Sequence, residues 1–194
     1  MQKLKREDLF TLERYAEERP AFRAKVMEHK KHRKLPIGPN ATLLFEDRLT
    51  IQYQIQEMLR IERIFEAGGI QDELDTYNSL IPDGTNWKAT LMLEFDDADE
   101  RRIALARLNG IERDVWIVVD GFERVSPFAD EDLERSTDEK TAAVHFLRFE
   151  LSEPMRHALE QGASLAAGID HEHYRYAVNP VPTVVRDALV ADLI

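Results

Sequence analysis

Residues 52–65 of the chain read QYQIQEMLRIERIF, and the interpretation of this stretch decides the rest of the fold. Its apolar residues recur every three or four positions, which is the period of an α-helix. At about 100° of rotation per residue they spread over an arc wider than a helix with one exposed side would show. The apolar residues in this arc are Ile51, Ile55, Met58, Leu59, Ile61 and Phe65. We therefore expect a helix over about residues 48–66 that other parts of the protein cover on several sides.

Three polar residues, Gln54, Glu57 and Glu62, fall within or beside the same arc, whereas Arg60 lies on the wetter side of the helix. A buried carboxylate must be ion-paired, hydrogen-bonded, metal-bound or protonated, because an unpaired buried charge costs several kcal/mol. Three interpretations are open: a structural ion pair, a ligand or metal site, or a helical phase that departs from the ideal one. We expect Glu62 to be largely buried and the helix to form one wall of a polar pocket.

The sequence on either side of the helix supports its boundaries and predicts strands beyond it. Asp47 stands where an N-cap is expected, and Ala-Gly-Gly at 67–69 is typical of a helix C-terminus. Farther along, alternating apolar residues predict a strand in WKATLMLEF at 87–95. The apolar run VWIVVDG at 115–121 predicts a strand that is buried on both faces.

The order of helices and strands predicts the fold class. Because they mix without a strict βαβ rhythm, we expect an α+β fold, with a mostly antiparallel sheet of five or six strands and helices packed on it. The fold is expected to be a single domain over residues 1–194, with an N-terminal helical arm at about 6–34. Residues 122–140 are charged and offer few side chains for burial, so we expect a mobile loop there.

Composition excludes several classes of function. The chain has 194 residues, 43% of them apolar, and carries a formal net charge of −11, which disfavours binding to nucleic-acid phosphates. No apolar run approaches the ~18 residues of a membrane span, and the first ten residues lack the apolar region of a signal peptide. Cysteine is absent, which excludes disulfides, thiolate metal sites and cysteine catalysis. We expect a cytoplasmic protein without a membrane or nucleic-acid partner.

Two histidines in predicted strands are candidate partners for the glutamates of the helix. His145 alternates with apolar residues of its strand, and His171 begins the His-x-His spacing of IDHEHY. Such a histidine is more often a hydrogen-bonded core residue than a ligand. Because carboxylates and imidazoles together bind divalent metals, iron, manganese or zinc is the candidate cofactor. The candidate metal ligands are Glu57, Glu62, His145 and His171. The candidate residues for a small polar ligand are Gln54, Glu57, Arg60, Glu62, His145 and His171.

Three segments resemble one bacterial protein family that is catalogued only as a domain of unknown function. They are LLFEDRLTIQYQIQEMLRIERI, AVHFLRFEL and GIDHEHY. The likeness extends over nearly the whole chain, and the Gln-Ile-Gln-Glu-Met-Leu-Arg core of the helix is its most specific mark. The resemblance points to Gln54, Glu57, Met58, Arg60 and Glu62. It also implies genes encoded beside rubrerythrin-like and iron–sulfur oxidoreductase genes, and hence a redox or peroxide-stress setting with a redox protein partner.

Three functions remain open at this point. The first is an accessory protein that binds a small ligand or a redox partner through a pocket lined by helix 48–66. The second is a metal-dependent enzyme or metal carrier that uses glutamate and histidine ligands. The third is a structural oligomeric protein, for instance a homodimer, in which the wide apolar helix is buried between subunits. No HExxH, P-loop, GxGxxG or GxSxG motif is present, so no catalytic residue is assigned.

Overall fold

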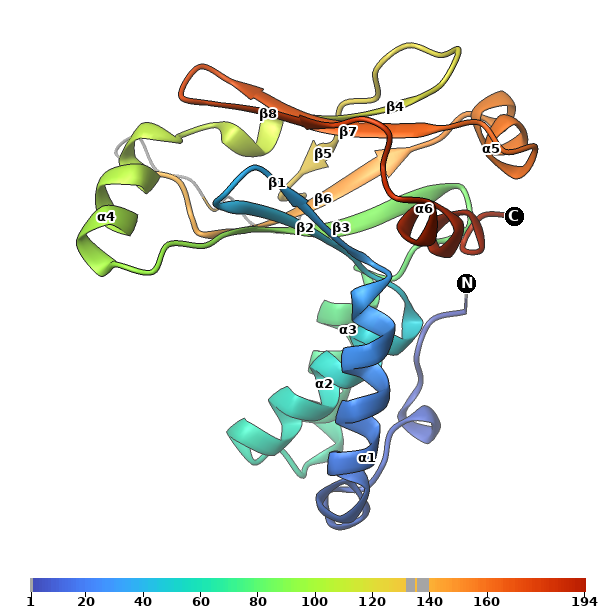
Figure 1. Ribbon diagram of the computed structural model, residues 1–194. Helices are drawn as coiled ribbons and strands as arrows, with labels where there is room; N and C mark the ends of the chain where they lie inside the picture. Colours follow the sequence, from blue (N-terminus) through green and yellow to red (C-terminus); the bar gives the residue numbers. More distant parts are fainter. Residues whose placement is uncertain (1, 132–134, 136–139) are drawn as a thin grey trace.

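The computed structural model describes the chain except for residues 1, 132–134 and 136–139. Two antiparallel sheets are stacked on each other, and three N-terminal helices project away from them (Figure 1). The first sheet has the order β1 (Lys34–Ile37), β2 (Ala41–Phe45), β3 (Asn86–Leu93), β6 (Val144–Glu150) and β5 (Phe128–Ala129). The second has the order β4 (Val115–Val119), β7 (Leu165–His171) and β8 (Tyr174–Val178). The α+β class with helices on mostly antiparallel strands is confirmed, and the second, three-stranded sheet adds to the expected one.

The main hydrophobic core lies between the two sheets. It takes Leu43, Leu91 and Leu147 from the first sheet and Ile117 and Ile169 from the second, all at most 2% exposed. Side chains alternate along each strand, so that β6 has every second residue buried. This alternation is the pattern from which the strands are predicted, and it explains why both sheets bury one face against the other.

The helical arm predicted at about residues 6–34 contains α1 (Leu12–Lys31), which packs with α2 (Arg48–Glu62) and α3 (Ala67–Asn78); from here on, the arm means these three helices. These helices pack on one another below the sheets (Figure 1) and enclose a second, smaller core. Its buried residues are Leu4, Ile51, Ile55, Leu59, Leu74 and Ile81. Asp47 is the N-cap of α2 as expected, because its side chain accepts the Thr50 backbone N–H at 2.9 Å while the Thr50 hydroxyl accepts the Asp47 N–H.

The remaining helices lie at opposite ends of the stacked sheets. Helix α4 (Ala98–Arg107) stands at one end, and α5 (Glu153–Glu160) and α6 (Thr183–Val190) stand at the other (Figure 1). No helix in the described part of the chain combines the length and the apolar character that a bilayer span requires.

The segment 122–140, expected to be a mobile charged loop, contains ordered structure in its described part. Val125 forms a β-bridge with Ile117, and β5 pairs with β6 at the edge of the first sheet. Residues 132–134 and 136–139 of this segment lie outside the described residues.

Candidate functional site

Glu57 of α2 is held by an ion pair inside the arm. Arg19 donates to both of its carboxylate oxygens at 2.8 and 2.9 Å, and the Tyr15 hydroxyl donates at 2.8 Å. The Arg19 guanidinium, with the Tyr15 hydroxyl and Arg60, lowers the pKa of Glu57 to about 2. Arg60 lies 3.4 Å from Glu57 Oε1. For Glu57 the structure therefore supports the structural ion pair among the three interpretations.

The other polar residues predicted on the buried side of α2 are exposed. The prediction that Glu62 is buried is wrong, and Gln54 is exposed as well. The residue buried in their place is Gln56, whose amide oxygen accepts the Phe10 backbone N–H at 2.6 Å. The predicted arc is too wide because α1 and α3 cover only part of α2 and leave the rest to solvent. The helix also ends at Glu62 instead of at about 66.

His145 is a hydrogen-bonded core residue and not part of a pocket with α2. Its ring is fully buried, with Nδ1 2.6 Å from Asp130 Oδ2 and Nε2 2.8 Å from Thr141 Oγ1. Nε2 also lies 4.0 Å from Oε2 of the buried Glu112. Asp130 adopts a left-handed backbone conformation (φ 49°), which lets its carboxylate also accept the Phe146 backbone N–H. The sequence offered no signal for Glu112 or Asp130, because neither shares a periodic pattern with the residue it serves.

His171, on β7, connects the second sheet to the end of α4. Its Nε2 faces the Asn109 carbonyl oxygen at 3.2 Å, and its Nδ1 accepts the His173 backbone N–H at 3.2 Å. The two glutamates of α2 belong to the arm, whereas His145 and His171 belong to different sheets (Figure 1). The predicted four-residue metal site is therefore not assembled. Within the described residues no group of three or more metal-binding side chains is positioned to hold a metal ion.

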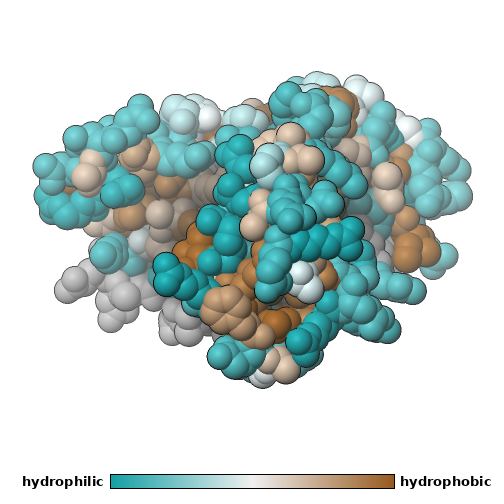
Figure 2. Space-filling view, turned by 90° about the horizontal axis from the view of Figure 1, so that it is seen from below, coloured by the Kyte–Doolittle hydropathy of each residue, from teal (hydrophilic) through white to brown (hydrophobic). Residues whose placement is uncertain are grey.

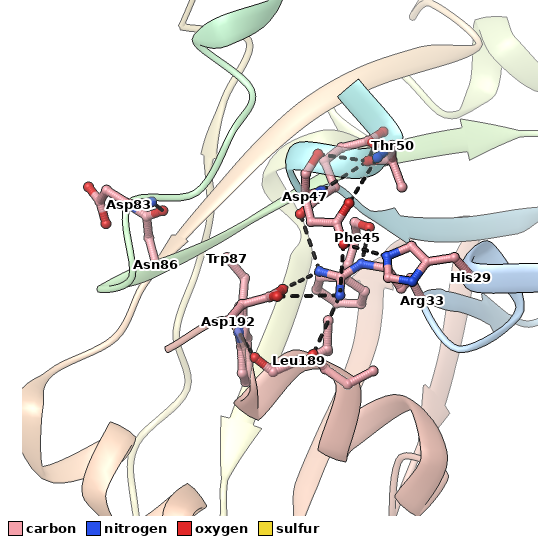
Figure 3. Close-up of polar contacts among 12 residues, drawn as sticks. His29, Arg33, Phe45, Asp47, Thr50, Asp83, Asn86, Trp87, Leu189 and Asp192 are labelled. Atoms are coloured by element: carbon pink, nitrogen blue, oxygen red, sulfur yellow. Dashed lines mark hydrogen bonds and ion pairs between the residues drawn. The ribbon is translucent and has the colours of Figure 1, made fainter. Parts of the chain in front are cut away.

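A buried charge cluster, which we name the Arg33 network, joins the arm to the sheets. It consists of Arg33, His29, Asp47 and Asp192. The Arg33 side chain is 2% exposed and lies between the two carboxylates (Figure 3), 3.4 Å from Asp47 Oδ2 and in direct contact with Asp192. It also donates to the Phe45 carbonyl oxygen at 3.0 Å.

The pKa values of two carboxylates in the Arg33 network shift in opposite directions, although burial acts to raise both. Burial alone would raise the pKa of Asp47, but Arg33, the Thr50 N–H and His29 together hold it below its usual value. Burial raises the pKa of Asp192, because Arg33 is shared with Asp47 and compensates it only in part. His29 Nε2 lies 2.5 Å from Asp47 Oδ2. Each charged residue of the network thus has a partner within it. We therefore interpret the network as structural, because it connects α1, the start of α2 and the C-terminal segment.

A spacious cavity, which we name the α4 cavity, lies between α4, the β1–β2 turn and the β7–β8 hairpin. Its volume is about 600 Å³. The apolar and aromatic residues that line it include Phe95, Ile103, Leu108, Tyr174 and Tyr176. The polar and charged ones are Asn40, Glu100, Arg107 and His173. His171, a candidate residue from the sequence, is buried next to this lining. Its ring centre lies 5.8 Å from that of the lining residue His173.

Hydrogen bonds and ring packing fix the two tyrosines that line the α4 cavity, Tyr174 and Tyr176. The Tyr174 hydroxyl donates to the Ile37 carbonyl oxygen at 2.7 Å and accepts the Asn40 and Ala41 backbone N–H groups. The Tyr176 ring lies 4.7 Å from the Tyr174 ring, centre to centre. Gly38 has φ +72°, and a Cβ there would lie 2.5 Å from Tyr176 Cγ, so only glycine allows this approach.

The charged residues of the lining include an arginine that has no ion-pair partner among the described residues. Arg107, in the last turn of α4, is exposed and makes no ion pair in the part of the chain that the structure describes. His173, on the β7–β8 turn, also lines the cavity, and its Nε2 lies 3.5 Å from Glu172 Oε1. The sequence did not indicate Arg107 or Phe95, because nothing in the local pattern distinguishes a cavity-lining side chain from a solvated one.

The comparisons with known proteins place the chain in one family. It belongs to the family described as "Protein of unknown function (DUF3501)", whose model matches residues 3–193. A crystal structure of a protein of unknown function from Burkholderia pseudomallei K96243 is similar over 100% of both chains, with 52% sequence identity and a TM-score of 0.94. The comparison with curated proteins gives no match. The predicted membership of a family of unknown function is confirmed.

Proposed function

We propose that this family member is a binding protein for a small organic anion with a planar apolar body, which it takes up in the α4 cavity. The volume of about 600 Å³ is the observation that carries this proposal, because it falls in the ~300–1,000 Å³ range of small-molecule sites. Apolar and aromatic side chains make up much of the lining, and a few polar groups converge on it, as is usual for such sites.

The lining residues suggest how such a ligand would be held. Phe95, Tyr174 and Tyr176 offer aromatic faces to a planar group. The Arg107 guanidinium can donate two parallel hydrogen bonds to a carboxylate, sulfonate or phosphate, and it has no competing ion pair in the described residues. His173 supplies a further polar group in the lining. His171 fixes the turn that carries His173, which gives that predicted residue a supporting role.

The accessory role expected from the sequence is kept in this proposal, but the pocket is relocated from α2 to α4. A metal-dependent reaction through Glu57, Glu62, His145 and His171 is not proposed, since the glutamates lie on α2, the histidines lie in different sheets, and no metal-binding group of three or more side chains is assembled in the described residues. The link to redox or peroxide-stress metabolism, with a redox protein partner, stays a prediction that rests on the family resemblance.

A pair of dyes tests the proposal. 8-Anilinonaphthalene-1-sulfonate is an anion with a planar naphthalene ring, and N-phenyl-1-naphthylamine is its neutral counterpart. Fluorescence titration should show that Arg107→Gln weakens sulfonate binding about ten- to hundredfold, because a hydrogen-bonded charge contact is lost. The neutral dye should be insensitive to this change. Tyr176→Ala should weaken both dyes.

The matched control is Arg102→Gln, which changes an exposed arginine of the same helix outside the cavity lining. It should leave both titrations unchanged. Sulfonate binding that survives both Arg107→Gln and Tyr176→Ala would refute the proposed site. With the site supported, displacement of the dye by a panel of aromatic carboxylates and phosphates identifies the ligand class.

A further inference from the structure

The free end of the arm exposes apolar side chains that its own core does not use. Ile61 and Phe65 are 62% and 63% exposed, although both are large and apolar. Beside them lies a hollow of about 240 Å³, lined by residues that include Leu9, Leu12, Ile64 and Ile70. We name this surface the arm tip. Seen from below, apolar side chains gather in the middle of the molecule and hydrophilic ones surround them (Figure 2).

The backbone at the end of α2 holds these side chains in place. Arg63 adopts the left-handed conformation (φ 55°), which is uncommon for a residue with a long side chain. The Ile64 N–H donates to the Leu59 carbonyl oxygen at 3.0 Å, so the chain turns sharply after the helix. Ile64 thereby packs against the small core of the arm, whereas Phe65 faces outward. The exposed phenylalanine is thus part of a defined turn.

The charges of the arm tip are balanced, which contrasts with the chain as a whole. Equal numbers of arginine and glutamate line the hollow or lie between positions 60 and 66. They are Arg6, Arg60, Arg63, Glu13, Glu62 and Glu66. All six are exposed, and in the described residues only Arg60 has an ion-pair partner, Glu57. The net charge of −11 makes two copies repel on average, whereas the six charges at the arm tip sum to zero and add nothing to that repulsion.

We propose that the arm tip binds a second copy of this chain in a two-fold symmetric contact. In such a contact the same surface faces itself, so a rim with both signs of charge can pair its arginines with the glutamates of the other copy. A partner of one sign would leave half of that rim unpaired. The apolar centre and charged rim match the usual organisation of a protein interface. This inference is independent of the ligand proposed for the α4 cavity.

The oligomeric state in solution tests the contact. Sedimentation velocity over a wide range of concentration should show a monomer–dimer equilibrium for the unaltered chain. Phe65→Ser should raise the dimer dissociation constant at least about tenfold. Its matched control is Val184→Ser, which alters a side chain that is 53% exposed on α6, outside the arm, and should leave the equilibrium unchanged. Because Phe65 is exposed, circular dichroism should show both variants folded.

Charge reversal provides a second, independent test of the contact. Arg60→Glu combined with Arg63→Glu makes the rim acidic and should also dissociate the dimer, through repulsion. Adding Glu62→Arg and Glu66→Arg restores the balance and should recover the dimer in part. A chain that stays monomeric at every concentration would overturn the proposal, and so would a dimer that is indifferent to Phe65→Ser. Binding of the dyes to the α4 cavity should be the same in all of these variants.

Discussion

The Arg33 network and the α4 cavity each place an arginine beside other polar groups, yet their physical situations are opposite. Arg33 is buried, and two carboxylates and backbone carbonyl oxygens satisfy its donors. Arg107 is exposed at a cavity and has no ion pair in the described residues. A buried arginine whose hydrogen-bond donors are already occupied has none left to bind a ligand. An exposed arginine beside an apolar cavity, with its donors unoccupied by carboxylates, can bind one. The comparison separates a structural arginine from a candidate functional one.

The largest expected effect concerns the structural arginine. Arg33→Met should destabilise the protein by about 3–5 kcal/mol, because Asp192 would remain buried without its cation and Asp47 would keep only His29 as an ion-pair partner in the described residues. Urea unfolding followed by circular dichroism measures the change. Arg102→Met on α4, where the side chain is exposed, is the control and should be close to neutral. Equal stability of the Arg33→Met variant and the unaltered chain would show that the network contributes nothing to the fold.

The pH dependence of Asp192→Asn sharpens the description of the same network. The folded-state pKa of Asp192 is raised, so its contribution to stability is present below the unfolded value of about 3.9 and is lost as the pH rises through the folded value. The Asp192→Asn variant has no carboxyl group at this position, so it does not lose stability through ionisation there. Its stability relative to the unaltered chain should therefore improve as the pH rises above about 4, as unfolding at a series of pH values can measure. A constant difference would contradict the raised pKa.

The Glu57 ion pair should have a smaller effect, because it is partly exposed to solvent. We expect Glu57→Gln to lower the melting temperature by a few degrees at neutral pH. Since the folded pKa of Glu57 is lowered to about 2, its contribution is present above the unfolded value of about 4.3 and is lost as the pH falls through about 2. The difference between the melting temperatures of the variant and the unaltered chain should shrink in acid.

Glu62→Ala is the matched control for Glu57→Gln, since it changes an exposed glutamate of the same helix. It should melt like the unaltered chain. A large destabilisation by Glu62→Ala would instead agree with the buried position that the sequence predicts for Glu62 and would contradict its observed exposure.

The smallest effect on stability is expected at the candidate functional arginine. Arg107→Gln should change the free energy of unfolding by less than about 0.5 kcal/mol, because it removes an exposed charge without an ion pair in the described residues. The same variant should lose dye binding in the titrations proposed above. A loss of both stability and binding would remove the distinction between the two arginines, since Arg107 would then be structural as well.

The sequence by itself determined the elements whose signals are local. The helix at α2 follows from the spacing of Ile51, Ile55 and Leu59, and its start follows from Asp47, because periodicity and capping act within a few residues. The strands β3 and β6 follow from their alternation for the same reason. Local rules also predicted that Glu57 requires a partner, but not which partner it finds.

Only the tertiary structure decided where the buried polar groups and the cavity lie. Glu57 and Glu62 are five positions apart on one helix, and the packing of α1 covers the first and leaves the second in solvent. The α4 cavity joins Arg107 to Tyr176 through the tie from His171 to Asn109 and the hydrogen bond from the Tyr174 hydroxyl to Ile37, contacts between residues far apart in the chain. No local pattern encodes such contacts, because they depend on which faces of distant elements bury each other.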